Sequence, residues 1–195
     1  MAAPPTFHLT NPIVTERLVL RPFEGRDFDR LFDLQSRPEV TRYLYWDPRS
    51  QVEVQESLAK KMASTHIGAD ADVLSVAVAD RADGRLIGDL TLMYISAAHR
   101  HGEIGYVFHP EVHGRGLATE ATRALVHLAF TDLGLHRVSA RLDARNHRSA
   151  ALLERLGLRR EAHLRENEWV KGEWTDEVIY AVLADEWPAS RLGVE

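Results

Sequence analysis

Three consecutive pieces of the sequence decide the fold: residues 104–108 read IGYVF, residues 109–116 read HPEVHGRG, and residues 117–130 read LATEATRALVHLAF. The first piece predicts a buried strand, and the third has the apolar spacing of a helix. Between them, Gly114 and Gly116 let the main chain approach a ligand closely. A strand, a glycine-rich turn and a helix N-terminus aim free N–H groups and a positive dipole end at one point, so the sequence predicts an anion site here.

Two common phosphate loops do not fit this stretch. A nucleotide P-loop needs Lys and then Ser or Thr after its second glycine, whereas Leu117 and Ala118 follow Gly116. A dinucleotide fingerprint needs Gly or Ala where Thr119 stands, together with a parallel sheet. The preceding strands instead join at Asp83-Gly84, a pair typical of a tight antiparallel hairpin.

The elements on either side complete a mixed α/β domain. Alternating apolar residues predict strands near 18–23, 73–79, 86–94, 138–142, 158–169 and 175–183. Capping residues and apolar stripes predict helices after Asp27, over 39–44, after Ser50, from Gly116 to Gly134, and from Asn146 to Gly157. This order favours one domain over residues 1–195, with a mixed, mostly antiparallel, twisted sheet flanked by helices.

Composition limits the function classes. The chain has 195 residues, no cysteine and a formal net charge of -5, so it lacks a thiol nucleophile and the basic excess of a general nucleic-acid binder. A mildly acidic surface suits a cationic substrate. The N-terminus has no signal-peptide pattern, and no apolar run approaches the length of a membrane span, so we expect a cytoplasmic protein.

The stretch from His113 to Ala118 resembles the pyrophosphate loop of the GNAT superfamily of N-acetyltransferases, with His113 in place of the usual Gln or Arg. Asn146, Ser149 and Gly157, one strand later, are similar to the superfamily's second cofactor motif. Residues of three stretches resemble the RimJ/RimL-type branch, which acetylates the N-termini of ribosomal proteins. They are Glu103 to Tyr106, Asn146 to Gly157, and a tail with Arg165, Glu166, Gly172, Asp176 and Tyr180. The resemblance covers residues 15–187 and implies a GNAT fold, acetyl-CoA as cofactor and an amine as acceptor.

The resemblance also implies where the cofactor lies. The main chain of the turn would hold its pyrophosphate, with Arg115 supplying charge and Thr119 a hydroxyl. Asn146 would cap its helix and contact the pantetheine or an ordered water. Backbone N–H groups left unpaired where two parallel strands diverge would polarise the acyl carbonyl. The cofactor residues expected are Val107, Phe108, His113, Gly114, Arg115, Gly116, Leu117, Ala118, Thr119 and Asn146.

The catalytic expectations follow the same family. The amine attacks the thioester directly, and Glu103, on the strand before the turn, is the first choice of base, with Glu166 the second. The alternative for Glu103 is an exposed strand residue. Ser149 either protonates the departing thiolate or only supports its helix start, because Leu153 stands where the family more often has tyrosine.

The acceptor is less defined by the sequence. Tyr43, Trp46, Glu166 and Trp169 fall where relatives shape the acceptor groove, although the aromatics also suit ordinary packing. An α-amine loses its proton more readily than a lysine amine, which favours a protein N-terminus. The alternatives are a small amine, such as an antibiotic, polyamine or amino acid, and a non-catalytic CoA-binding module. We expect no metal, no nucleic acid and no membrane partner; a monomer and a homodimer both remain open.

Overall fold

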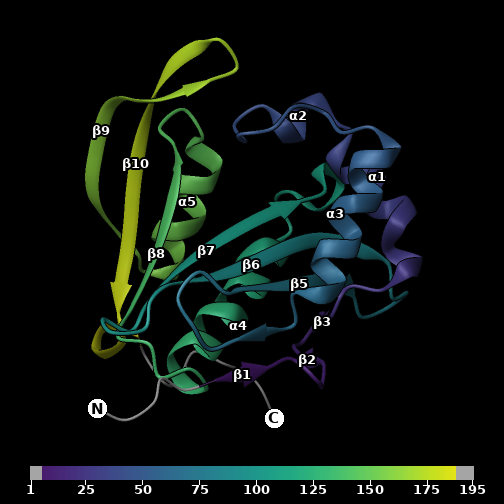
Figure 1. Ribbon diagram of the computed structural model, residues 1–195, viewed down its shortest axis with the longest axis horizontal. Helices are drawn as coiled ribbons and strands as arrows, with labels where there is room; N and C mark the ends of the chain where they lie inside the picture. The colour runs from purple at the N-terminus through teal and green to yellow at the C-terminus, as the bar shows by residue number, and fades with distance from the viewer. Residues whose placement is uncertain (1–5, 188–195) are drawn as a thin grey trace.

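The computed structural model describes residues 6–187 and is built around one eight-stranded sheet (Figure 1). All neighbouring strands in this sheet are antiparallel except β7 and β8, as the sequence predicts. In spatial order the strands are β2 (Ile13–Val14), β3 (Leu18–Arg21), β5 (Val73–Asp80), β6 (Leu86–Ser96), β7 (His101–Phe108), β8 (Arg137–Asp143), β10 (Glu173–Leu183) and β9 (Arg159–Val170). A separate pair joins β1 (Phe7–His8) to β4 (His66–Ile67).

Helices lie on both faces of the sheet, and the apolar core on one face is larger than that on the other (Figure 1). α4 (Leu117–Thr131) and α5 (His147–Leu156) pack on the larger apolar core, to which β5 contributes Val76 and Val78. α1 (Phe28–Gln35) and α3 (Gln51–Ala63) lie on the opposite face, where a smaller core includes Ala77. Alternation along a strand explains this division. The short elements are η1 (Gly25–Asp27), α2 (Pro38–Thr41), η2 (Pro110–Val112) and η3 (Ala184–Glu186).

Several predicted element boundaries are confirmed by their local chemistry. The Ser50 hydroxyl accepts from the backbone of Glu53, whose carboxylate accepts from the Ser50 backbone, so the two form the expected capping box of α3. The Asn146 side chain caps α5, and Gly157 ends it with a left-handed φ of 92°. Lys171 and Gly172 form the two-residue turn between β9 and β10, both with positive φ.

Two predicted helix caps are not made. Asp27 is the residue that precedes α1, as predicted, but its side chain makes no cap bond, because both of its oxygens are 2.7 Å from the guanidinium of Arg21 in a buried ion pair. Gly134 does not end α4 either: the last helical residue is Thr131, and Gly134 lies in the following loop with φ 56°. Propensity assigns both residues to helix ends. The Asp27 side chain is instead used in an ion pair, and Gly134 lies in a loop.

The strands that position the site are β7 and β8. Their parallel pairing covers only three residues of β7 and ends where Glu103 lies opposite Ser139. Beyond that point β7 continues beside β6, while β8 continues beside β10, and the two diverge (Figure 1). We call the place where they separate the fork. It brings the carboxyl end of β7, the N-terminus of α4 and the N-terminus of α5 to one side of the sheet.

Candidate active site

The turn between β7 and α4 has the geometry of an anion cradle. Gly114 and Gly116 have φ values of 75° and 76°, in the left-handed region that favours glycine. Gly116 is the N-cap of α4, and its carbonyl accepts the first helical hydrogen bond from Glu120. The N–H groups of Gly116 and of the next three residues therefore have no helical partner. Leu117, Ala118 and Thr119 stand in the first turn, as the anion site requires.

An arginine remote in sequence fixes this turn. Arg17 donates from Nη1 to the carbonyl of Arg115 at 2.9 Å and from Nε to the carboxylate of Glu120 at 2.7 Å. Glu120 also accepts from the Thr15 hydroxyl at 2.6 Å and from the Arg17 backbone at 2.9 Å. These contacts tie the start of β3 to the start of α4. Neither Arg17 nor Glu120 carries a sequence signal for this role, because their contact spans 103 residues.

The side chain of His113, at the first position of the turn, has a neighbour that the sequence does not predict. His113 lies 3.3 Å, through Nδ1, from a guanidinium nitrogen of Arg148 on α5. Burial lowers the pKa of His113, and the positive charge of Arg148 adds to this effect, so the ring is neutral at neutral pH. Arg148 is exposed and brings a second cation to the turn beside Arg115. The first position of the motif therefore contributes a neutral ring with an arginine neighbour.

Main-chain groups face the fork in an alternating pattern. The N–H of His109 donates to the carbonyl of Ile87, which continues the β6–β7 ladder. In an antiparallel ladder every second residue turns its backbone groups to the same neighbour, so Val107 turns toward β6. Tyr106 and Phe108 turn theirs toward the fork. The expectation of free N–H groups on both Val107 and Phe108 is thus right for Phe108 and wrong for Val107. The second N–H group that faces the fork belongs to Tyr106.

Tyr106 and Ser149 connect the two sides of the fork. The Tyr106 hydroxyl is 2.6 Å from Ser149 Oγ and donates to the Ser149 carbonyl at 3.1 Å. Burial raises the pKa of Tyr106 to about 12, although the hydrogen bond to Ser149 works in the opposite direction. The Ser149 backbone N–H meanwhile donates to Asn146 Oδ1 at 3.1 Å. Ser149 is thus at a helix start, as expected, and it also has a hydroxyl partner that the sequence does not predict, Tyr106 on β7.

Glu103 lies at the fork with its side chain 26% exposed. Burial raises the pKa of its carboxyl group; Arg141 on β8, with Nε 3.6 Å away, lowers it, and Glu177 on β10 raises it further. Because side chains alternate along a strand, Glu103 shares the α3 face of β7 with Gly105 and Val107. A carboxylate that is partly buried and whose pKa is raised has the properties of a general base.

A cleft of about 610 Å³ opens on this same face of the sheet, between β6 and β7 on one side and α1, α3 and the segment after α2 on the other. Gly105 and Val107 line it next to Glu103 along β7. Its other lining residues are Gln35, Leu44, Trp46, Arg49, Glu53, Glu56, Ser57, Lys60, Lys61, Ser64, Val73, Ser75, Asp89, Thr91 and Tyr106. The charged side chains among them are three acidic and three basic, so the wall of this cleft has no net charge.

The family model for the "Acetyltransferase (GNAT) domain" matches residues 17–159. The chain belongs to the GNAT family of acetyltransferases. The uncharacterized N-acetyltransferase YnaD of Bacillus subtilis is 30% identical over 175 residues, covering 90% of this chain and 98% of YnaD. YdaF of the same species, whose name proposes a ribosomal N-acetyltransferase, is 30% identical and covers 91% of this chain and 97% of YdaF. Spermidine N-acetyltransferase of Vibrio cholerae, solved with CoA and spermine, has a TM-score of 0.74 at 26% identity, covering 87% and 96% of the two chains.

The GNAT assignment makes this chain an N-acetyltransferase that uses acetyl-CoA. The residues present fit this group. Two glycines with positive φ and a run of unpartnered helix N–H groups suit its phosphates. The backbone of Tyr106 and Phe108 at the fork suits its acyl arm. Among residues 6–187, no helix is long and apolar enough to cross a membrane, and no three His, Asp or Glu side chains are arranged to hold a metal ion.

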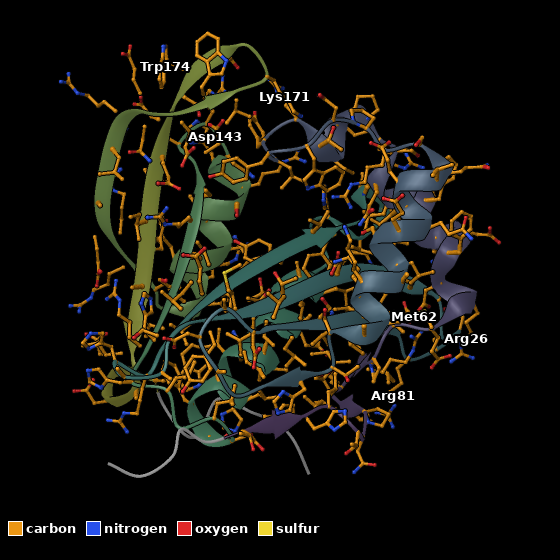
Figure 2. The ribbon with its side chains drawn as sticks, in the orientation of Figure 1. Arg26, Met62, Arg81, Asp143, Lys171 and Trp174 are labelled. Atoms are coloured by element: carbon orange, nitrogen blue, oxygen red, sulfur yellow. The ribbon has the colours of Figure 1, made fainter. Side chains whose placement is uncertain are left out.

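The predicted acceptor residues are not brought together as one group. Trp46 lines the cleft, with the guanidinium of Arg49 stacked 4.3 Å from its ring centre. Tyr43 lies in a smaller adjoining hollow together with Tyr45 and Glu177. Trp169 is 60% exposed, does not line the cleft, and packs edge-on against Trp174. Trp174 lies near the β9–β10 turn (Figure 2). Glu166 is exposed and lines neither hollow.

The β9–β10 hairpin nevertheless reaches the acceptor side of the molecule. At its turn, Lys171 Nζ donates to the carbonyl of Thr41 at 2.7 Å and lies 3.6 Å from Asp47 (Figure 2). Glu166 has a φ of 48° in an irregular part of β9, and its N–H donates to Asp176 at 2.9 Å. The hairpin therefore closes against the segment that carries Trp46, while its two tryptophans remain on the outside.

Proposed function

We propose that the acceptor of this N-acetyltransferase is the α-amine of a protein N-terminus, as in the RimJ/RimL-type branch. The observation that carries this proposal is the charge balance of the cleft beside Glu103, where Arg49, Lys60 and Lys61 offset three carboxylates. An extended peptide behind its terminal amine is a neutral main chain, which such a wall accommodates. A polycation would gain more from a wall of carboxylates.

A second acceptor class has its own support. The hollow beside the cleft is lined by four carboxylates and two tyrosines, namely Asp143, Glu168, Asp176, Glu177, Tyr43 and Tyr45. Carboxylates and aromatic faces attract ammonium groups. Spermidine N-acetyltransferase of Vibrio cholerae is one of the similar structures. A small polyamine is therefore the alternative acceptor.

Acetyl-CoA supplies the activated acetyl group, and each part of the site has a defined task toward it. The glycine turn, held by Arg17 and Glu120, binds its phosphates. Asn146 caps α5 through Oδ1, which leaves its Nδ2 free to donate to the pantetheine arm. The N–H groups of Tyr106 and Phe108 face the fork and would stabilise negative charge that develops on the acyl carbonyl there.

In this scheme protons are moved by the carboxylate of Glu103 and by the hydroxyl pair of Tyr106 and Ser149. Glu103 accepts the proton of the acceptor amine, directly or through water, and its raised pKa makes it a better base than an exposed carboxylate. Tyr106 and Ser149 form a hydroxyl pair that returns a proton to the departing sulfur. Because a thiol has an ordinary pKa of about 8.5, this second transfer is the less demanding one. We further propose that residues 1–195 form a single acetyltransferase domain.

A panel of acceptors tests the function. Peptides with a free N-terminal Ala or Ser, the same peptides blocked at the N-terminus, spermidine and an aminoglycoside are compared by their kcat/KM at pH 7.5. We expect the free peptides to exceed spermidine by at least about tenfold and the blocked peptides to be inert. A higher kcat/KM for spermidine would assign the polyamine class instead.

The base is tested by Glu103→Gln, with Glu166→Gln as the matched variant. We expect Glu103→Gln to lower kcat/KM by about 100-fold and chiefly at low pH, where the amine is most protonated. Glu166→Gln should have little effect, because Glu166 is exposed on β9, which is separated from the fork by β10. The reverse ranking would move the base to Glu166.

A further inference from the structure

A row of three charged side chains crosses the fork on the acceptor face of the sheet. Arg141 on β8 lies between two carboxylates: its Nε is 3.6 Å from Glu103 on β7, and its Nη1 is 3.5 Å from Glu177 on β10. The parallel pairing of β7 and β8 ends at Ser139, two residues before Arg141. Arg141 therefore stands just inside the opening of the fork, on the same face as Ser139.

Glu177 is the more firmly held of the two carboxylates. It is only 2% exposed, whereas Glu103 is 26% exposed. Asn167 Nδ2 donates to its second oxygen at 3.0 Å, and the Tyr45 hydroxyl donates to the first at 3.3 Å. A register shift in the β9–β10 pairing at this point gives β9 the extra residues that bring Asn167 across. A buried carboxylate needs such partners and a counter-charge, which Arg141 provides.

The other groups near Glu103 carry no charge at neutral pH. His101 precedes it on the same face of β7, and its ring is 2.8 Å from the Ser139 hydroxyl. Burial lowers the pKa of His101, and Arg137 adds to this effect, so the ring is neutral. Met93 faces Glu103 from β6. The charges that act on Glu103 are therefore those of Arg141 and Glu177.

We propose that Arg141 is a positioning residue shared by Glu103 and Glu177, and that Glu177 restrains it from forming a closed ion pair with the base. This inference rests on the proposed role of Glu103. If Arg141 bound Glu103 alone at hydrogen-bonding distance, the carboxylate would be neutralised and occupied, and it would be a poor base. With Arg141 held between the two, Glu103 keeps its orientation, and its oxygens remain available to the acceptor amine.

The arrangement predicts shifts of opposite sign in two variants. Removing the positive charge with Arg141→Gln should raise the pKa of Glu103, and removing the negative charge with Glu177→Gln should lower it, each by about 0.5–1 pH unit at this partly exposed site. The double variant should return close to the wild-type value. Arg141→Lys keeps the charge and should shift the pKa least. Arg137→Gln is the control: Arg137 is on the same strand but pairs with Glu161.

The pKa is read directly by carbon NMR titration of the Glu103 carboxyl in the protein without cofactor, and independently from the low-pH limb of kcat/KM. Opposite shifts in the single variants, with near-cancellation in the double variant, support the proposal. Shifts of the same sign, or a change in Arg137→Gln as large as in Arg141→Gln, overturn it. The two readouts also separate the proposals: opposite NMR shifts with an unchanged kinetic limb would retain the coupling and reject Glu103 as the base.

Discussion

The two halves of this active site are built in different ways. On the cofactor side, the turn from His109 to Gly116 and the start of α4 form a contiguous piece of chain, and its main-chain N–H groups form the proposed phosphate cradle. On the acceptor side, the cleft is lined by residues from six separate stretches: α1, the segment after α2, α3, β5, β6 and β7. A main-chain site tolerates many side chains, whereas a side-chain site changes with each substitution. The difference explains why the cofactor of this enzyme is evident and its acceptor is not.

The two sides also differ in how they are held. Arg17 and Glu120 fix the cofactor turn through direct hydrogen bonds of 2.6–2.9 Å. On the acceptor side, Arg141 lies 3.5–3.6 Å from each of its two carboxylates, which is longer than a good hydrogen bond. The cofactor turn is therefore held by short hydrogen bonds, whereas Arg141 is paired more loosely with each of its two carboxylates.

The largest effect should come from the main chain of the cofactor turn. Gly116→Val places a branched side chain at φ 76° in the cradle, where an added Cβ would lie 3.6 Å from Arg17. Gly172→Val introduces similar strain at φ 83° in the β9–β10 turn, with open space around it. Calorimetry should show about 10- to 100-fold weaker CoA binding for Gly116→Val, which is about 1.4–2.8 kcal/mol, and unchanged binding for Gly172→Val. Equal losses in both variants would mean that strain alone matters.

The hydroxyl pair at the fork should give the next largest effect. Tyr106→Phe removes the partner of Ser149, and we expect kcat to fall about tenfold with little change in the KM for the acceptor. Tyr180→Phe is the matched control, because the Tyr180 hydroxyl also binds α5, at Glu154, 2.9 Å away. Steady-state kinetics of the two variants measure the difference. If Tyr180→Phe lowers kcat as much, the loss reflects the seating of α5 and not a proton transfer.

Sequence reasoning succeeds where the determining residues are neighbours along the chain. The capping box of Ser50 and Glu53, the Asn146 cap and the glycine turn are all local patterns, and each is confirmed. The mixed sheet follows from the same periodicities, because the one parallel pair among residues 6–187, β7 and β8, is linked through the helix α4.

Sequence reasoning fails where a residue acts through a partner that is distant along the chain. Arg17 meets the cofactor turn across about a hundred residues of chain, and Tyr106 meets Ser149 across 43. No local spacing indicates either contact. The choice between Val107 and Tyr106 at the fork depends on the phase of the ladder with β6, which a single strand does not reveal. Asp27 has the residue type of an N-cap, but the buried Arg21 competes for it.

Two tryptophans predicted for the acceptor site separate in the structure, and this makes a third test. Trp46 lines the cleft beneath Arg49, whereas Trp169 is on the exposed tip of the hairpin. We expect Trp46→Ala to raise the acceptor KM about five- to tenfold, with CoA affinity unchanged, and Trp169→Ala to change the KM by less than about twofold. A larger KM effect at Trp169 would show that the hairpin tip contacts a long acceptor beyond the cleft.

The smallest effect compares one carboxylate from each side of the site. Burial works to raise the pKa of Glu120, but the hydrogen bonds from Thr15 and Arg17 outweigh it, so the pKa lies below its ordinary value. A carboxyl group of this kind stabilises the fold above its unfolded pKa of about 4.3, and this contribution is lost as the pH falls. Glu103 is the opposite case, because burial raises its pKa, so its contribution is largest at low pH and is lost as the pH rises.

Melting temperatures measured from pH 3 to pH 8 should therefore diverge. Glu120→Gln should lower the Tm at pH 7, by the equivalent of about 1 kcal/mol, and this deficit should shrink toward pH 3. Glu103→Gln should leave the Tm at pH 7 equal to or slightly above that of the wild type and lose this advantage at pH 3. The opposite slopes follow from one carboxylate being hydrogen-bonded within the fold and the other being partly buried at the fork. Parallel slopes would mean that both carboxylates serve the same structural role.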